Sequence, residues 1–182
     1  MIFFLPIETK RLILRPLTLN DLNDSIEHRA DTDVCRYISV PMNASEVLSF
    51  INKSSINWQG NDHEKLAIGI QHKREKKIIG ELMFKYIDQK NKIAEIGFRL
   101  NRHYHSKGFA KEATINLINV LFNKLGMNKI TAICDVDNLS SYKLMEALGM
   151  TREAHFKSQV YLNGEWRDQY QYYILKKLWQ EK

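Results

Sequence analysis

The sequence is poor in the residues that mark specialised classes of protein. Among its 182 residues there are only three prolines and two cysteines, and there is no low-complexity tract. Cys35 and Cys134 lie far apart and neither has a second cysteine nearby, so neither a disulfide framework nor a zinc site is indicated. We therefore expect an ordered chain without a metal ion in a reducing, cytoplasmic setting.

The opening segment, Met1–Pro6, is apolar, but it lacks a preceding basic region and is too short to cross a bilayer. We interpret it as a terminal segment that docks on the protein, and we expect no membrane association. With 44% hydrophobic and 26% charged residues, the composition is that of an ordinary globular protein. At this length, residues 1–182 are expected to form a single domain.

The formal net charge is +6, which favours an anionic cofactor, nucleic acid or an acidic partner. The basic residues are mixed with acids, as in residues 73–77, rather than massed in a tail. Most of the charge is therefore interpreted as solvated surface and a smaller part as a means of recognising a polyanion. No groove-reading element is visible, so direct nucleic-acid binding, which would be tight and salt-sensitive, is not expected.

Hydrophobic periodicity and turn residues predict an α/β (α+β) protein with strands and helices in a fixed order. The strand at 93–100 is followed by the longest helix and then by another strand, a passage that normally makes a parallel crossover. A mixed sheet with helices packed on it is therefore expected. The predicted strands are 11–17, 66–70, 78–87, 93–100, 129–136, 156–161 and 169–175, and the predicted helices begin near 19 and 45 and span 107–125 and 139–148.

The loop that enters the longest helix has two small residues, Gly108 and Ala110, separated by one position. Such a loop can direct several backbone N–H groups and the positive end of the helix dipole at one point, which suits a phosphate. The alternative is that Gly108 only turns the chain into the helix. The spacing of a nucleotide P-loop and the three-glycine dinucleotide fingerprint are both missing.

The segment His105-Ser106-Lys107-Gly108-Phe109-Ala110 resembles motif A of the GNAT acetyltransferases, in which Gln/Arg-x-x-Gly-x-Gly/Ala grips the pyrophosphate of acetyl-CoA. The first position here is histidine rather than glutamine or arginine. Further segments in the same order resemble the RimJ/RimL branch, which acetylates N-terminal amino groups of ribosomal proteins. These segments are residues 8–16, 79–81, 94–98, 138–142 and 147–150.

This resemblance implies a GNAT fold: a mixed, mostly antiparallel sheet of about seven strands with helices on both faces and a splay between the fourth and fifth strands. It implies acetyl-CoA as cosubstrate, with its pantetheine arm bound by unpaired peptide groups and by Asn138. The alternative for Asn138 is an N-cap of the following helix, and the two roles are compatible. The expected cofactor-binding residues are Phe98, Arg99, Leu100, His105, Ser106, Lys107, Gly108, Phe109, Ala110, Asn138 and Ser141.

Glu95 and Ser141 are the candidate catalytic residues. Glu95 lies on the strand beside the expected splay and is a candidate general base for the amine, while the alternative is a solvent-facing or ion-paired strand residue. Many GNAT enzymes protonate the leaving thiolate with a tyrosine seven residues after the asparagine, but Met145 stands here. The resemblance implies that Ser141 hydrogen-bonds the leaving sulfur instead, and that the neighbouring Tyr142 packs.

Other reactive or aromatic residues are given weaker roles. Cys134 lies on the predicted fifth strand, where an acyl-cysteine would need a base to form the thiolate, so a buried, inert cysteine is favoured. The aromatic residues at positions 58, 86, 161, 166 and 170 are candidates for the acceptor cleft or for core and rim. The histidines at 28, 63, 72, 103 and 155 have no metal-ligand spacing and are expected at the surface.

The acceptor is expected to be a primary amine, most simply a protein or peptide N-terminus. An α-amino group has a reference pKa of about 8 against roughly 10.4 for lysine, so more of it is neutral at physiological pH. The alternatives are a small-molecule amine, such as a polyamine, an amino acid or an antibiotic, and a non-catalytic acyl-CoA-binding module. The oligomeric state is expected to be a monomer or a homodimer.

Overall fold

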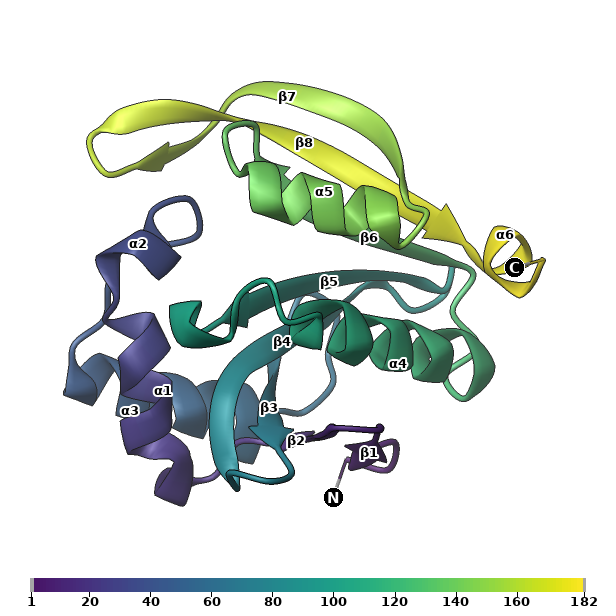
Figure 1. The fold of residues 1–182 in the computed structure, drawn as a ribbon. Helices are drawn as coiled ribbons and strands as arrows, with labels where there is room; N and C mark the ends of the chain where they lie inside the picture. The colour runs from purple at the N-terminus through teal and green to yellow at the C-terminus, as the bar shows by residue number, and fades with distance from the viewer. Residues whose placement is uncertain (1, 182) are drawn as a thin grey trace.

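One sheet of eight strands organises the molecule in the computed structural model, which describes residues 2–181 (Figure 1). The spatial order of the strands is β1-β2-β3-β4-β5-β6-β8-β7. The strands are β1 (Ile7–Glu8), β2 (Leu12–Pro16), β3 (Leu66–His72), β4 (Lys77–Asp88), β5 (Ile93–Leu100), β6 (Lys129–Asp135), β7 (Thr151–Leu162) and β8 (Glu165–Leu175).

Only β5 and β6 run parallel, and every other neighbouring pair is antiparallel. The predicted mixed, mostly antiparallel sheet is therefore confirmed, and so is the parallel passage from 93–100 through the longest helix. The additional strand is the two-residue β1, which pairs with Ile13 and Leu14 of β2. It is too short to produce a hydrophobic alternation that a sequence pattern could reveal.

Helices cover both faces of the sheet (Figure 1). Alternate residues of β3 show the two faces: Ile68 and Ile70 belong to the core under α4 and α5, whereas Ala67 packs with Val47 of α3 on the other face. The helices are α1 (Leu22–Arg29), α2 (Thr32–Cys35), α3 (Ala44–Ile51), α4 (Phe109–Asn123), α5 (Leu139–Ala147) and α6 (Lys176–Gln180), with short helical turns η1 (Leu19–Asp21), η2 (Asn52–Ile56) and η3 (Arg102–Tyr104).

The helix predicted from residue 45 towards 58 is broken into two parts. Asn43 caps α3 by accepting a hydrogen bond from Glu46 N–H, and after Ile51 the chain widens into the π-helical turn η2. In this turn the Ser55 hydroxyl donates to the Ala67 carbonyl at 2.7 Å. The wider turn thus attaches the end of the helix to β3, a contact that helical periodicity does not encode.

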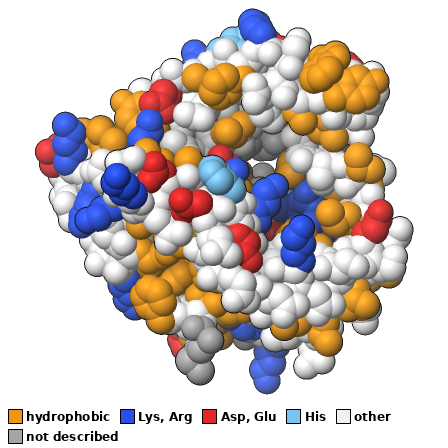
Figure 2. Space-filling view, turned by 180° about the vertical axis from the view of Figure 1, so that it is seen from behind, with side chains coloured by type: hydrophobic (Ala, Val, Ile, Leu, Met, Phe, Trp, Pro, Cys, Tyr) orange, Lys and Arg blue, Asp and Glu red, His pale blue; other side chains and the backbone are white. Residues whose placement is uncertain are grey.

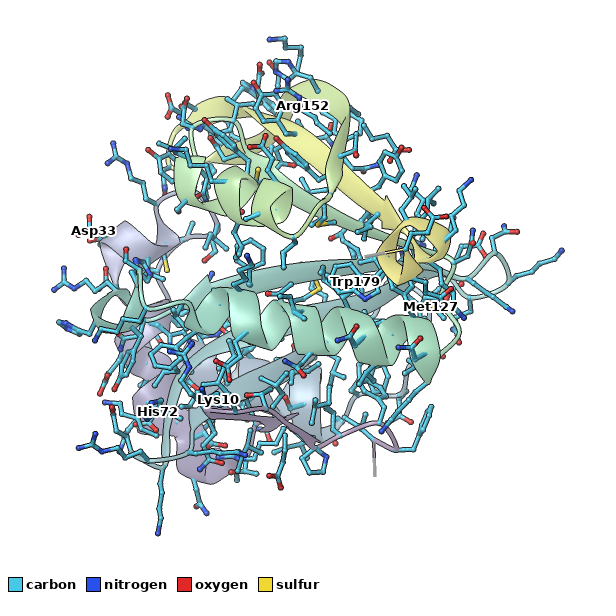
Figure 3. The ribbon with its side chains drawn as sticks, turned by 45° about the vertical axis from the view of Figure 1, so that its right-hand side comes forward. Lys10, Asp33, His72, Met127, Arg152 and Trp179 are labelled. Carbon is cyan, nitrogen blue, oxygen red and sulfur yellow. The ribbon has the colours of Figure 1, made fainter. Side chains whose placement is uncertain are left out.

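The apolar N-terminal segment docks as expected. Phe4 and Leu5 are buried in the main core, where the Phe4 ring packs edge-on against Phe84 of β4. Met1 lies outside the described residues. At the other end of the chain, Trp179 of α6, labelled in Figure 3, donates its indole N–H to Asn119 of α4 at 2.7 Å, so both ends of the described chain lie against the central layers.

No helix among residues 2–181 combines the length and the apolar character needed to cross a membrane.

Candidate active site

The sheet opens between β5 and β6. These strands pair only from Ile93 to Glu95 on β5 and from Lys129 to Thr131 on β6. Beyond Glu95, β5 pairs only with β4, while the remainder of β6 pairs only with β8. The two strands therefore diverge at the position where the resemblance implies a splay.

Hydrogen bonds at both ends of β5 show which peptide groups face this opening. Ala94 accepts from the Thr131 hydroxyl on the β6 side, whereas the Asn101 N–H donates to Ile79 on the β4 side. Because successive peptide groups of a strand point to opposite sides, those of Phe98 and Leu100 face the opening. The peptide group of Arg99 faces β4 instead, so of the three residues expected to offer peptide groups to pantetheine, only Phe98 and Leu100 have them in place.

The loop before α4 forms a cradle of backbone N–H groups. Gly108 has φ of +77° and Ser106 has φ of +59°, so two left-handed residues turn the chain into the helix. The first helical bond runs from Glu112 N–H to the Gly108 carbonyl, which leaves the N–H groups of Phe109, Ala110 and Lys111 ahead of the helical ladder. These donors and the helix dipole fit a diphosphate.

Three side chains of the loop have defined packing or hydrogen-bond partners. The Phe109 ring is buried and packs edge-on against His72, labelled in Figure 3, with ring centroids 5.2 Å apart. Phe109 therefore offers only its backbone to a ligand. Nε2 of His105 lies 2.9 Å from the Leu100 carbonyl oxygen, so this imidazole serves as a donor that closes the loop onto β5. Lys107 extends over the Tyr104 ring, with its Nζ 5.4 Å from the ring centroid.

Arg11 and Glu112 anchor this loop from the N-terminal strands. Arg11 Nε donates to Glu112 Oε2 at 2.6 Å, and Arg11 Nη1 donates to the Lys107 carbonyl at 2.9 Å. The Thr9 hydroxyl donates to Glu112 Oε1 at 2.6 Å. Burial opposes ionisation of Glu112, but the hydrogen bonds from Thr9 and Arg11 outweigh it and lower the pKa of this carboxyl.

Sequence reasoning did not assign a role to Arg11 or Glu112. The signal available was the segment 8–16, which resembles the opening of the RimJ/RimL branch. The structure gives a physical reason for that segment. Thr9 and Arg11 hydrogen-bond Glu112 and the Lys107 carbonyl, and so fix the N-terminus of α4.

Asn138 and Ser141 lie across the opening from the loop, at the start of α5. Asn138 Oδ1 accepts from Ser141 N–H at 3.1 Å, so its capping role is present. The Asn138 amide nitrogen has no hydrogen-bond partner within the described part of the chain and is available to a ligand. Ser141 is nearly buried, and its hydroxyl hydrogen-bonds the Cys134 thiol.

Three residues near Ser141 bear on how the leaving thiolate would be stabilised. Met145, which stands where many GNAT enzymes have the tyrosine acid, is fully buried. Burial raises the pKa of Cys134 to about 12, which makes its thiolate inaccessible near neutral pH and supports the interpretation of an inert cysteine. The Tyr142 ring packs edge-on against Tyr170, with centroids 6.2 Å apart.

Glu95 lies at the last paired position of β5, directly below the opening. Its Oε1 forms an ion pair with Lys85 Nζ at 2.9 Å, and the Glu95 side chain is only 12% exposed. Glu95 is therefore an ion-paired strand residue at the edge of the opening. By strand alternation, Glu95 shares its sheet face with Arg99, opposite the face covered by α4.

A buried polar cluster occupies this second face. Glu81 of β4 lies 2.8 Å from Arg29 Nε and 3.3 Å from His28 Nε2, both on α1. Burial alone would raise the pKa of Glu81, but the charge of Arg29 and the close contact with His28 lower it to about 2. The prediction that the histidines other than His105 lie at the surface was wrong for His28, which is buried. Its partner Glu81 belongs to a strand distant in sequence, so the contact could not be read from local patterns.

The same face is hollowed, and lysine or arginine side chains gather in the hollow (Figure 2). A cavity of about 290 Å³ lies between the segment after α2 and the β7–β8 hairpin. Its lining includes Arg36, Tyr37 and Arg167 together with the acidic Asp137 and Glu165. Arg167 is engaged by buried Asp135 at 2.7 and 2.8 Å, and also contacts Asp137 and Glu165.

The aromatic residues considered for the acceptor cleft divide between core and rim. Trp58 and Tyr86 pack against the main core near Phe84. Tyr161 and Trp166 are exposed on the β7–β8 hairpin. No cluster of three or more histidine, cysteine, aspartate or glutamate side chains that could hold a metal ion occurs among residues 2–181.

Comparisons with known proteins agree with this geometry. Residues 11–151 match the family described as the acetyltransferase (GNAT) domain. The chain is 33% identical over 175 residues to YnaD, an uncharacterized N-acetyltransferase of Bacillus subtilis, covering 95% of this chain and 98% of the relative. The structure of a GNAT-family acetyltransferase from Bacillus anthracis superposes with a TM-score of 0.85 at 30% identity, covering 95% of this chain and 99% of that chain.

The chain therefore belongs to the acetyltransferase (GNAT) family. It is an acetyl-CoA-dependent N-acetyltransferase, and its residues fit that cosubstrate. The cradle before α4 suits the diphosphate. The peptide group of Phe98 and the N–H of Leu100, which face the opening, suit the amide-containing pantetheine arm, while the Leu100 carbonyl is taken by His105.

Proposed function

We propose that this enzyme acetylates the α-amino group of a protein or peptide N-terminus, as in the RimJ/RimL branch. The observation that carries the proposal is that the carboxylates beside the cavity between the segment after α2 and the β7–β8 hairpin are engaged by an arginine rather than free. A polycationic acceptor would need several unpaired carboxylates there. Asp135, Asp137 and Glu165, the carboxylates near the cavity, are all held by Arg167.

The names of relatives point in two directions. The ribosomal-protein-serine acetyltransferase of Escherichia coli is 28% identical over 95 residues, and the spermidine N(1)-acetyltransferase of Vibrio cholerae is 26% identical over 102 residues. Each match covers about half of this chain. Because the identities are similar, we favour the peptide acceptor on the ground that the carboxylates near the cavity are already paired with Arg167.

In the proposed reaction, Glu95 removes a proton from the acceptor ammonium, directly or through a water molecule. The neutral nitrogen attacks the thioester carbon, and the Phe98 and Leu100 peptide groups place N–H donors beside the carbonyl oxygen as it gains negative charge. The new C–N bond forms as the C–S bond breaks, and the nitrogen loses its second proton to water. The Ser141 hydroxyl hydrogen-bonds the departing sulfur, which takes up a proton from water and leaves as the thiol of CoA.

A small-molecule amine is the second candidate, since the hollow would also admit an amino acid. A non-catalytic acyl-CoA-binding role is disfavoured by the ordered positions of Glu95 and Ser141 at the opening. That residues 1–182 form one domain, that the protein is cytoplasmic, and that it is a monomer or homodimer stay predictions.

The test is release of free CoA thiol from acetyl-CoA with a matched panel of acceptors. The panel contains short peptides with a free N-terminus, the same peptides with a blocked N-terminus, and spermidine. We expect turnover only with the free N-termini, and mass spectrometry should place one acetyl group on the α-nitrogen. Turnover with spermidine but with no peptide would refute the proposal.

A further inference from the structure

Arg99 carries a charge that the folded chain leaves only partly compensated. Among residues 2–181, the arginines with no carboxylate oxygen within 4.0 Å are Arg36, Arg74, Arg99 and Arg152. Arg99 is the one of these that is buried, with 7% of its surface exposed. Its Nη1 has no hydrogen-bond partner within the described residues.

The nearest acid does not neutralise it. Glu81 stands opposite Arg99 on β4, but its carboxylate contacts Arg29 and His28. The Glu81 carboxylate is thus engaged by Arg29 and His28 and lies more than 4.0 Å from the Arg99 guanidinium, and burial lowers the pKa of Arg99 from its ordinary value. Burying a guanidinium that is only partly paired destabilises the folded protein when no ligand is bound. A bound anion would offset that destabilisation.

The position of Arg99 links this charge to the acceptor. Its peptide lies between those of Phe98 and Leu100, which face the opening, while its side chain lies on the face opposite α4. Nη2 donates to the Ser39 hydroxyl at 2.7 Å, and Ser39 is partly exposed in the segment after α2. The Ser39 hydroxyl therefore lies between the guanidinium and a partly exposed segment that also carries Arg36 and Tyr37 of the cavity lining.

We propose that Arg99 binds an oxyanion carried by the acceptor close to its reactive amine, so that the preferred substrates are α-amines followed within one or two residues by an acidic side chain. This inference rests on the proposed function, because it assigns the second recognition element of the same acceptor site. The guanidinium fork suits a carboxylate or a phosphate, which it can bind through two parallel N–H groups. Ser39 supplies a further donor beside it.

The experiment compares tetrapeptide amides that differ at the second residue: aspartate, asparagine or phosphoserine. Free alanine and alaninamide form a second pair, in which the anion is the acceptor's own carboxylate. For the wild-type enzyme we expect kcat/KM to be about tenfold to hundredfold higher for the aspartate peptide than for its asparagine counterpart, from loss of a hydrogen bond to a charged group. Most of the difference should lie in KM.

The variant Arg99→Gln should abolish this preference, because KM for the aspartate peptide should rise to the value for the asparagine peptide measured with the same variant. A purely structural role would affect both peptides equally. Arg99→Lys keeps the charge and should retain part of the preference, and Arg102→Gln, which alters an exposed arginine paired with Asp31 and Asp33, is the matched control. Acetyl-CoA affinity, measured for each variant, reports whether the fold is intact.

Equal wild-type kinetics, or equal binding where turnover is absent, for aspartate and asparagine peptides would overturn the inference while leaving peptide acetylation standing. A preference that persists in Arg99→Gln would also overturn it. If alanine is acetylated much faster than alaninamide and no peptide reacts, the anion site stands and the peptide acceptor fails. The phosphoserine peptide shows whether a phosphate replaces the carboxylate.

Discussion

At the scale of single residues, Glu95 combines accessibility with an ion pair. Its carboxylate has 12% side-chain exposure and a lysine partner at 2.9 Å, directly below the point where β5 and β6 separate. Its role is most needed when the acceptor amine is protonated.

Replacing Glu95 with glutamine should therefore lower kcat by about 100-fold near neutral pH, which is the lower end of the usual effect of general base catalysis. The deficit should shrink above about pH 9, where an α-amino group with a pKa near 8 is already neutral. Steady-state rates across this range measure the effect. Glu153→Gln is the control, because Glu153 forms a similar pair with Lys129 at 2.5 Å on β7. Equal pH profiles for wild type and Glu95→Gln would remove Glu95 from the mechanism.

At the scale of elements, the N-terminus of α4 is the part on which cofactor binding depends. Gly108 needs its left-handed φ, and an added Cβ would have only the Arg11 guanidinium within 4 Å, at 3.5 Å. There is thus space for a small side chain, but not for a negative one beside a bound diphosphate. The effect of backbone strain on stability and the effect of charge on cofactor binding can therefore be measured separately with two variants.

Gly108→Asp should weaken acetyl-CoA binding by at least about tenfold, since it disturbs charge-assisted hydrogen bonds to the diphosphate. Gly126→Asp, at the other end of α4, imposes a similar left-handed strain at φ of +68° with nothing within 4 Å. Both variants should lose about 1 kcal/mol of stability, but only the first should lose affinity in calorimetric titration. Unchanged affinity in Gly108→Asp would contradict the assignment of the cradle.

Glu81 joins α1 to the sheet and should make stability depend on pH. Its folded pKa of about 2 lies below the ordinary glutamate pKa of 4.5, so its contribution to stability is complete above pH 4.5 and is lost as the pH falls towards 2. The loss is of the order of 3 kcal/mol, from about 1.36 kcal/mol per pKa unit. Urea denaturation of wild type and Glu81→Gln at several pH values measures it.

At neutral pH, Glu81→Gln should be destabilised by about 3–5 kcal/mol because Arg29 would lose its counter-charge within the core. The gap between variant and wild type should narrow in acid. Glu8→Gln, whose pair with Lys73 lies at the surface, should change stability by less than about 1 kcal/mol. A gap that stays constant down to pH 2 would show that Glu81 is not ionised in the folded protein.

At the scale of the whole molecule, cofactor binding should stabilise the two sides of the open sheet together. The loop before α4 and the start of α5 lie on opposite sides of the opening, so acetyl-CoA should bridge them (Figure 1). At 100 times its Kd, a ligand adds about 2.7 kcal/mol of stability. For a chain of this size, we expect Tm to rise by about 5–10 °C.

Thermal denaturation with and without acetyl-CoA measures this rise, with adenosine as the control that lacks the diphosphate. Gly108→Asp should show a reduced rise at the same ligand concentration. No rise for the wild-type protein at any accessible concentration would contradict the binding mode on which the mechanism depends.

What the sequence by itself determined lies in local backbone chemistry. The order of strands and helices, the parallel passage around α4, and the left-handed glycine with exposed N–H groups before that helix follow from periodicity and residue type within short windows. The resemblance located the splay. Asn138 was correctly expected to be able to cap its helix, because capping involves residues three positions apart.

Only the tertiary structure decided which side chains meet on the face opposite α4. The burial of His28, the partner of Glu95 and the partly unpaired charge of Arg99 all depend on neighbours from distant strands and helices. Such contacts depend on register, since a shift of one residue would exchange the two faces of β5. The sequence contains this information, but short-range patterns do not display it, because burial and charge pairing are properties of the assembled layers.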